Sequence, residues 1–252
     1  MVYLSIAISV VMVLALGWLE RRANAGGGGS NADWAINLLA WLLNIAAGFT
    51  VYTVITVLDG PALLRGEDLA PWLAVALYVL VQDFAEWLFH RAQHAVPVLW
   101  SMHSLHHSDP EMSALTTTRH FWADRAFKTV TVWSLAAMVI APTVPALLVY
   151  FALSFWNYVA HANLRWDFGW WSWVINSPAY HRRHHSSLPE HYDSNFAALF
   201  PVWDVLFGSY NRPHGYPPTG FERRPRSLRE LVLWPWVGEQ EQVAVAREQG
   251  AI

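Results

Sequence analysis

The sequence contains no cysteine and few charged residues. Without cysteine among its 252 residues, the chain has no disulfides, no thiolate metal site and no cysteine nucleophile. Charged residues make up only 14% of the chain and the net charge is −3, so there is no basic surface of the kind that binds nucleic acid. A dinucleotide-binding glycine fingerprint and a haem-domain extension are also missing. Any metal must therefore be bound through nitrogen or oxygen.

Apolar residues and tryptophan are abundant instead. Hydrophobic residues make up 54% of the chain, which has sixteen tryptophans, and this balance is typical of a membrane protein. Several apolar runs are long enough to cross a bilayer. We expect an all-α integral membrane protein with a transmembrane helical bundle of about four to five spans, from the runs Val2–Leu19, Trp34–Leu58, Leu69–Phe89 and Ala126–Ala160. The last run is about twice the length of a short span and has Pro142 and Pro145 at its middle, so it predicts a helical hairpin.

The distribution of arginine and lysine predicts the orientation. Glu20, Arg21 and Arg22 directly follow the first run, and if the two arginines lie in the cytoplasm, only Arg65 among the sixteen basic residues lies outside. The same assignment places every histidine on the cytoplasmic side. A cleaved signal peptide is the alternative for the first run, because Ala23-Asn24-Ala25 resembles a cleavage site, but a basic n-region is missing. We expect an inner-membrane protein with a cytoplasmic helical cap.

The histidines occur in sets with helical spacing. Residues three and four apart share one face of a helix, so each set presents its imidazoles together. Eight histidines form three such sets and a ninth stands alone: His90 and His94; His103, His106 and His107; His181, His184 and His185; and His161. That number exceeds what one ion can coordinate, which predicts two metal ions.

Some other polar and aromatic residues are expected to support the metal site, and others are expected to have no role in metal binding. Asp83 and Glu86 continue the stripe of His90 and His94, and we expect them to accept the N–H of a metal-binding imidazole, with Glu86 as an alternative direct ligand. Asn157 lies one turn before His161 and is a candidate ligand through a water molecule. We expect no metal role for His191 and His214. The tryptophans near the predicted cap are expected to be interfacial anchors: Trp100, Trp166, Trp170, Trp171 and Trp173.

At these residues the sequence resembles the bacterial branch of the fatty acid hydroxylase and sterol desaturase superfamily. The matching segments are DFAEWLFHRAQH, LWSMHSLHHSDPEMSALTTTR, HANLR, PAYHRRHHS, DSNFA and WDVLFGSY, between Asp83 and Tyr210. The resemblance implies a di-iron centre whose ligands are the nine histidines named above. The chain departs from the family after Arg119, where many members read Arg-Phe-His-Pro and this chain has His120 one position earlier. His120 is therefore left out of the predicted ligands. Some relatives have a further histidine where this chain has Asn157.

The resemblance also implies an activity and a division of the chain. We expect an O2-dependent oxidoreductase that hydroxylates or desaturates a lipid, such as a fatty acyl chain, sterol, ether lipid or carotenoid, with two irons and a separate reductase, ferredoxin or cytochrome as electron donor. The expected parts are an N-terminal transmembrane helix at 1–25, a glycine-rich connector at 26–33, a fatty acid hydroxylase-like catalytic domain at 34–215 and a tail at 216–252. A membrane zinc hydrolase with Glu86 as base is one alternative, and a haem or metal-transfer protein is another.

Overall fold

The fold is mostly helical, as predicted. A computed structural model describes residues 2–23, 31–55, 61–221 and 223–237. Its α-helices are α1 (Val2–Arg22), α2 (Asn31–Ile55), α3 (Pro71–Ala95), α4 (Pro97–His107), α5 (Trp122–Val139), α6 (Val144–Ser154), α7 (Trp156–His161), α8 (Pro178–His184), α9 (Val202–Leu206) and α10 (Leu228–Val232). The short elements are β1 (Leu64–Arg65), β2 (Ile140–Ala141) and the 3₁₀ helices η1 (Gly66–Asp68), η2 (Ala114–Thr118), η3 (Gly169–Trp173) and η4 (Pro189–His191). Most of the predicted connector at 26–33 and the last part of the tail lie outside the described residues.

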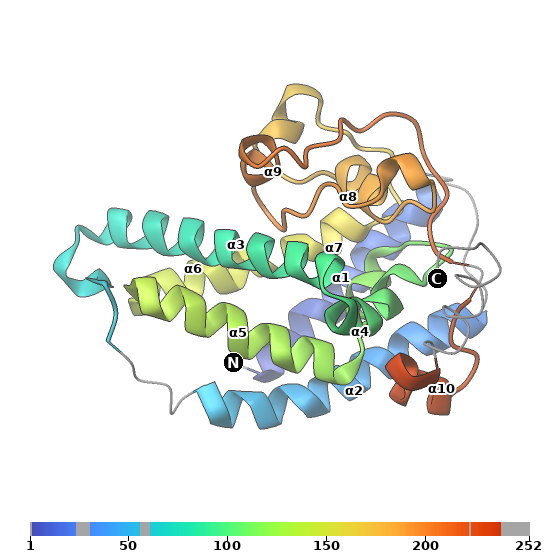
Figure 1. Cartoon of the computed structure of the whole chain (residues 1–252), viewed down its shortest axis with the longest axis horizontal. Helices are drawn as coiled ribbons and strands as arrows, with labels where there is room; N and C mark the ends of the chain where they lie inside the picture. Colours follow the sequence, from blue (N-terminus) through green and yellow to red (C-terminus); the bar gives the residue numbers. More distant parts are fainter. Residues whose placement is uncertain (1, 24–30, 56–60, 222, 238–252) are drawn as a thin grey trace.

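The long helices lie lengthwise beside one another. Figure 1 shows α2, α3, α5 and α6 in this arrangement, in which α3 packs against α5 and α6, and α2 packs against α5. At one end of the bundle β1 pairs in parallel with β2, next to the turn between α5 and α6. At the other end lie α4, α7 and α8, which carry histidines. Segments far apart in sequence therefore converge on one end of the bundle.

The predicted hairpin over 126–160 is present, with its turn at the expected prolines. α5 ends at Val139, before the β2 segment and Pro142. Thr143 then caps α6 by accepting a hydrogen bond from the Ala146 N–H, and Pro145 stands in the first turn, where a missing N–H costs nothing. The second half of the hairpin is divided at Phe155 into α6 and α7.

Two helical segments among the described residues have the length and apolar composition needed to cross a bilayer. They are Pro71–Ala95, which is α3, and Val144–His161, which comprises α6 and α7. The first two apolar runs of the sequence form α1 and α2. The number of spans stays a prediction.

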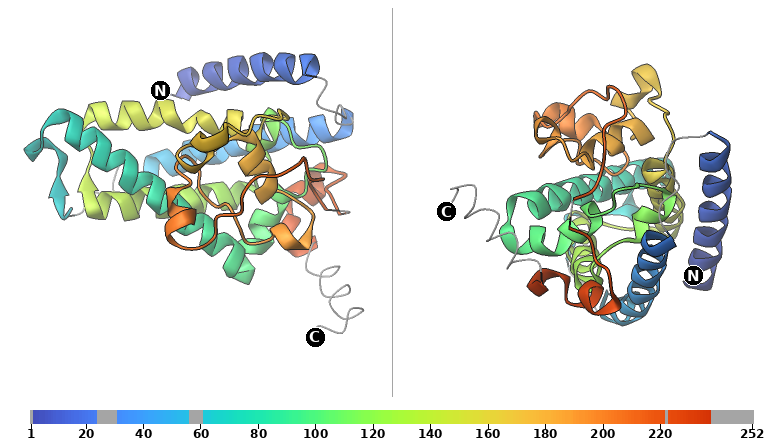
Figure 2. Two further views of the ribbon diagram at one scale, coloured as in Figure 1. Left: turned by 90° about the horizontal axis from the view of Figure 1, so that it is seen from above. Right: turned by 90° about the vertical axis from the view of Figure 1, so that its right-hand side faces the viewer.

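A second layer of short helices and loops covers one side of the histidine-bearing end. Figures 1 and 2 show this layer, residues 162–221, above α3, and we call it the cap. Two buried carboxylates hold it in place. Asp83 on α3 accepts hydrogen bonds from the Leu199 and Phe200 N–H groups, at 2.9 and 3.1 Å, and Asp204 on α9 accepts one from the Trp87 indole at 3.1 Å. The cap is therefore anchored to α3 by a carboxylate of α3 and by a carboxylate of the cap itself.

The N- and C-terminal segments pack onto the same body. On α1, the Glu20 carboxylate accepts hydrogen bonds from the Ala114 and Asn163 N–H groups, both at 2.8 Å. Leu231 and Trp234, predicted to belong to a tail, are buried in a core cluster with residues of α2 and α4. Residues 223–237 therefore support the end of the bundle where the histidines lie.

Among the glycines that the structure describes, Gly220 has the least room for a side chain. Its φ is +83°, and a Cβ would lie 2.5 Å from the Cα of Pro110. Gly220→Ala is expected to lower the free energy of unfolding by about 2–4 kcal/mol, because a left-handed backbone and a backbone clash both oppose alanine. Thermal unfolding in detergent measures the effect. Gly215 is the matched control, since its φ is +67° but nothing lies within 4 Å of its Cβ position. Equal losses of unfolding free energy in Gly220→Ala and Gly215→Ala would show that the contact with Pro110 does not destabilise the variant.

Candidate metal centre

The structure brings all nine predicted ligands together. They come from four helices and the residue that follows α8: His90 and His94 from α3; His103, His106 and His107 from α4; His161 from α7; and His181, His184 and His185 from α8 and its C-terminus. All but His94 are buried, and His94 is partly buried. Nine imidazoles in one buried volume would be costly unless their nitrogens had partners.

The imidazoles form two groups. One group has five members, His90, His94, His103, His107 and His184, and the other has four, His106, His161, His181 and His185. Within each group the ligand atoms all lie within 4.8 Å of one another. We call them the five-histidine group and the four-histidine group. Two groups of this size match two metal ions better than one.

Several ring nitrogens converge at spacings that suit a shared ion. The Nε2 atoms of His90 and His103 are 3.1 Å apart, and the Nε2 atom of His161 lies 3.0 Å from those of His106 and His181. Two nitrogens bound about 2.1 Å from one ion are about 3 Å apart when their bonds meet near a right angle. The convergence therefore fits coordination.

Buried nitrogens without hydrogen-bond partners also support coordination of a metal. Within the described chain, the Nε2 atoms of four cluster histidines have no such partner: His94, His107, His184 and His185. A buried ring nitrogen without a partner is rare and calls for an explanation such as binding of an ion. The donor set, entirely imidazole nitrogen, suits iron, zinc or copper. The residues present therefore fit a pair of such ions.

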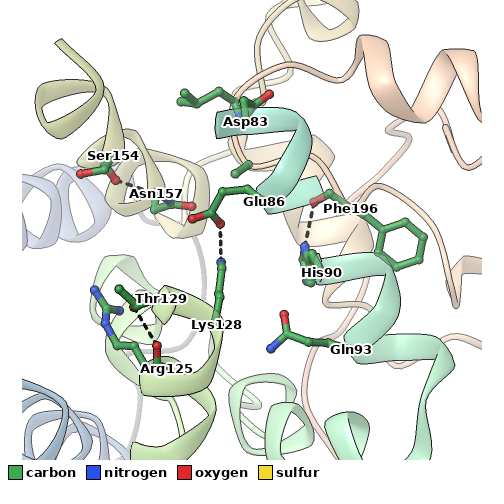
Figure 3. A network of polar contacts seen from close by, with 12 residues as sticks. Asp83, Glu86, His90, Gln93, Arg125, Lys128, Thr129, Ser154, Asn157 and Phe196 are labelled. Atoms are coloured by element: carbon green, nitrogen blue, oxygen red, sulfur yellow. Dashed lines mark hydrogen bonds and ion pairs between the residues drawn. The ribbon is translucent and has the colours of Figure 1, made fainter. Parts of the chain in front are cut away.

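Backbone carbonyls fix the protonation of three candidate ligands. The Nδ1 atoms of His90, His161 and His184 donate to carbonyl oxygens of Phe196, Asn157 and Ser194, at 2.7, 2.7 and 2.8 Å. Figure 3 shows the first of these contacts, between α3 and the cap. A proton held on Nδ1 leaves the Nε2 lone pair free for a metal.

A carboxylate that the sequence analysis did not select lies beside the candidate ligand His103. Asp124, fully buried at the start of α5, lies 3.4 Å from the His103 Nδ1 and 3.4 Å from the His120 Nδ1. The amide nitrogen of buried Gln93 is 2.6 Å from Asp124 and 3.1 Å from the His103 Nδ1. Two sequence signals were available: Asp124 follows His120 by one helical turn, and Gln93 directly precedes His94. Neither signal identifies the contact with His103, which depends on packing of α3, α4 and α5.

Asp124→Asn is expected to weaken metal binding while the fold persists. The amide keeps the size of the side chain but lacks the charge that orients His103, and loss of such an orienting group costs roughly 10–100-fold in metal affinity. The measurement is metal retained after dialysis against graded chelator. Asp167→Asn is the control, because Asp167 is exposed and accepts from the nearby Gly169 N–H. Equal retention in wild type and Asp124→Asn would show that Asp124 does not act on the metal.

Asp83 and Glu86 contact other groups than the predicted imidazoles. Both oxygens of Asp83 are occupied by N–H groups of the cap, including the Trp203 indole at 2.9 Å. Glu86 forms an ion pair with Lys128 at 2.5 Å and accepts a hydrogen bond from the Tyr150 hydroxyl at 3.3 Å (Figure 3). The sequence analysis expected both carboxylates to accept an imidazole N–H, and the contacts found for them are different. The reason is that the cap and α5 supply nearer donors.

Asn157 and His120 stand beside the metal groups. The Asn157 side-chain amide donates to the Ser154 carbonyl at 3.1 Å, as Figure 3 shows, and a role as ligand through water stays a prediction. His120 stacks on His106 with ring centroids 4.2 Å apart, and it can form a set only with His103 and Asp124. His120 belongs to neither the five-histidine nor the four-histidine group, and its omission from the ligands stays a prediction. His191 is buried and its Nδ1 lies 2.8 Å from the Ser186 hydroxyl.

Burial keeps the cluster imidazoles neutral. It lowers the pKa of His103 to about 4, against the opposing effect of the Asp124 carboxylate. It also lowers the pKa values of His106, His184 and His185 well below the ordinary value, and repulsion from neighbouring imidazoles lowers them further. Only a neutral imidazole has a lone pair to give to a metal, so these residues are ready to bind one at pH 7.

A cavity of about 290 Å³ opens onto the five-histidine group. Three of that group's histidines line it together with aromatic and small polar side chains: His94, His107, His184, Trp100, Tyr192, Phe221, Ser186 and Asp193. Asp193 lies 3.4 Å from the His94 Nδ1, so one wall of the cavity also contacts a candidate ligand. No member of the four-histidine group lines this cavity. A small molecule in the cavity would therefore meet the five-histidine group.

Comparison with curated proteins gives several relatives that act on lipids. The chain is 27% identical to an alkylglycerol monooxygenase of Xenopus tropicalis over 210 residues, which are 83% of this chain and 46% of the relative. It is 30% identical to the alkylglycerol monooxygenase of Homo sapiens over 146 residues, 56% of this chain and 31% of the relative. It is 26% identical to ornithine lipid hydroxylase OlsE of Rhizobium tropici over 140 residues, 55% and 42% of the two chains. This chain thus spans less than half the length of these relatives.

No solved structure gives a significant match. The family model described as fatty acid hydroxylase matches residues 75–209, more than half of the chain. That range includes all nine histidines of the two groups and both carboxylates that anchor the cap to α3. The resemblance seen in the sequence motifs is thereby confirmed, and the chain belongs to the fatty acid hydroxylase family.

Proposed function

We propose that the protein is a membrane-bound di-iron oxygenase that hydroxylates a C–H bond of a lipid with O2. The observation that carries the proposal is the division of nine imidazoles into a five-histidine and a four-histidine group at one end of a helical bundle. Two irons held there would supply the activation of O2, which amino-acid side chains cannot provide.

The side chains of the protein hold and shield the site. The Nδ1 contacts of His90, His161 and His184 fix the imidazoles in one orientation, so a metal meets a site that is already formed. The cavity beside the five-histidine group is where we place the oxidised carbon of the lipid. Its aromatic walls, which include Trp100 and Phe221, suit an apolar chain and displace water from the site.

The names of the relatives favour hydroxylation over desaturation. An alkylglycerol monooxygenase and an ornithine lipid hydroxylase both insert oxygen by name, into lipids with a polar headgroup. We therefore prefer a polar lipid, such as a glycerol ether or an amino-acid lipid, over a sterol or carotenoid. Hydroxylation consumes O2, two electrons and two protons, and it releases one water for each hydroxyl formed. The electrons would come from a separate reductase, ferredoxin or cytochrome.

We place the bundle in the bacterial inner membrane with the histidines on the cytoplasmic side. α3 and the Val144–His161 segment support insertion. The positions of the arginines support the orientation, because Arg21 and Arg22 end α1 close to the cap whereas Arg65 is on β1 at the opposite end of the bundle.

A zinc hydrolase is less well supported by the geometry. Catalytic zinc usually has three protein ligands, fewer than either group offers. Glu86, the base that a hydrolase would need, is held by Lys128 and Tyr150. A haem protein is also less well supported, because a haem needs one pair of axial histidines and the site has groups of five and four.

Metal analysis and isotope incorporation test the proposal together. Protein purified in detergent is expected to contain about two irons per chain, without the Soret band of haem. With a reductase, ferredoxin and a lipid extract under ¹⁸O2, the product should gain one ¹⁸O atom. Stoichiometric zinc in an active enzyme, bound haem, or label from water instead of O2 would overturn the proposal.

A further inference from the structure

The cap has an apolar surface beside α3 whose side chains are not covered by the rest of the described chain. It consists of two segments, which we call the tryptophan–α9 surface: Trp166, Trp170, Trp171, Trp173 and Val174 around η3, and Val202, Val205, Leu206 and Phe207 on and after α9. Trp170 is 86% exposed, Trp171 67% and Leu206 66%. Monomeric soluble proteins rarely leave several large apolar side chains so exposed in one place.

The two segments lie at the same end of the cap. Figure 1 shows η3 and α9 at the end that faces along α3 toward the β1 and β2 end of the bundle, and the right-hand view of Figure 2 shows them on opposite flanks of the cap. Ring contacts join them, since Trp173 lies 5.8 Å from Tyr210, which belongs with Trp87 and Tyr180 to one hydrophobic cluster. Phe207 stacks on Trp87 in the same region, with ring centroids 4.7 Å apart.

The surface continues onto the outer face of α3. Phe84 of α3 stacks on Phe207 at 5.9 Å, and Leu80 and Leu88, each one turn from Phe84, are exposed. One turn beyond Trp87, toward the histidine-bearing end, the chain has exposed Arg91, whose guanidinium lies over the Trp87 ring and contacts the Phe207 carbonyl. The apolar stripe of a helix that can cross a bilayer therefore ends in a cation at the height of α9.

We propose that the tryptophan–α9 surface is a membrane-docking surface, on which the cap rests in the interfacial layer of a phospholipid bilayer. Indole rings favour this layer because they combine a large apolar body with an N–H that can stay hydrated. Arg91 is placed to meet lipid phosphate groups at the same depth. The inference rests on the proposed placement of α3 in the membrane, and it does not depend on the metal or on the reaction.

The docking surface fixes the position of the metal groups relative to the lipid. Trp87 and His90 are one turn apart on α3, so the first ligand of the five-histidine group lies just above the level at which α9 meets α3. A lipid need not leave the bilayer completely to bring a carbon near the site. The cap would thus be held at the depth that its substrate requires.

The absence of cysteine allows a direct test in the whole protein. Trp171→Cys and Leu206→Cys, each labelled with the fluorophore NBD, are compared with labelled Glu190→Cys, since Glu190 is an exposed residue of η4 in the cap and outside the surface. The proteins are placed in nanodiscs of phosphatidylcholine and phosphatidylglycerol. Quenching by doxyl-labelled lipid and by aqueous iodide is then measured.

The expected result is a blue-shifted emission at positions 171 and 206, with strong quenching by doxyl lipid and weak quenching by iodide, and the reverse at position 190. Labels at 171 and 206 that behave like the label at 190 would overturn the proposal. So would labels shielded from both quenchers, which would indicate that a protein covers the surface. Metal content and turnover of the same samples report separately on the proposed function, so either proposal can fail alone.

Discussion

Replacing His184 by alanine is expected to remove about one of two metal ions and to abolish lipid oxidation. His184 is buried, its Nδ1 is held by the Ser194 carbonyl, and its Nε2 has no other partner in the described part of the chain. It also lines the cavity in which we place the reacting carbon. Alanine removes a ligand and leaves room for water beside the metal, so we expect turnover to fall by at least on the order of 100-fold.

The measurement is metal content per chain together with ¹⁸O incorporation into the product. His214→Ala is the control, because His214 is exposed and outside both groups. His120→Ala is a finer control, expected to leave the metal content largely intact even though the ring stacks on His106. Full metal and full turnover in His184→Ala would refute the assignment of the five-histidine group.

His181→Ala provides a matched comparison on the same helix. His181 and His184 are three residues apart on α8, yet His181 belongs to the four-histidine group. Each variant should therefore lose a different ion, and cobalt-substituted protein should show a different remaining absorption spectrum in each. Identical spectra would mean that the two histidines serve one ion.

The same pair shows how far the sequence could predict the site. Helical spacing was enough to select eight of the nine histidines that meet in space, because each set shares a helix face. The ninth, His161, stands alone in the sequence and was selected through the resemblance to the family. Spacing could not divide them, since His181 and His184 lie on one face and still belong to different groups. The division depends on how α3, α4, α7 and α8 pack against one another, and that packing is not encoded in the spacing of any single helix.

The hydrogen-bond partners of the buried carboxylates could not be predicted from the sequence either. The position of Asp83 on an apolar helix predicted a contact with an imidazole, but its hydrogen-bond donors belong to the cap and are 116 to 120 residues away in sequence. Most of the cap is loop and short helix, without a periodic pattern that would predict its path. Asp124 was missed for the same reason, because its contact with His103 forms only when α5 packs against α4.

The largest effect on stability is expected from Asp204→Ala. Asp204 is fully buried and accepts hydrogen bonds from the Trp87 indole, the Tyr180 hydroxyl, the Phe196 and Ala197 N–H groups and the Ser209 hydroxyl. These partners join α3, α8 and the loops on both sides of α9. Each buried donor left unpaired costs about 1–3 kcal/mol. The sum is on the order of the entire stability of a domain, about 5–15 kcal/mol.

The cap of Asp204→Ala is therefore not expected to fold, and the loss should extend to the metal. The Phe196 carbonyl, which fixes the His90 Nδ1, belongs to the loop that Asp204 holds. Thermal unfolding in detergent and metal content measure the two effects, with Asp167→Ala as the control, because exposed Asp167 accepts from a neighbouring N–H in its own turn. A variant with wild-type unfolding temperature and two ions would contradict this account. Intact stability with lost metal would restrict the role of Asp204 to orienting His90 through Phe196.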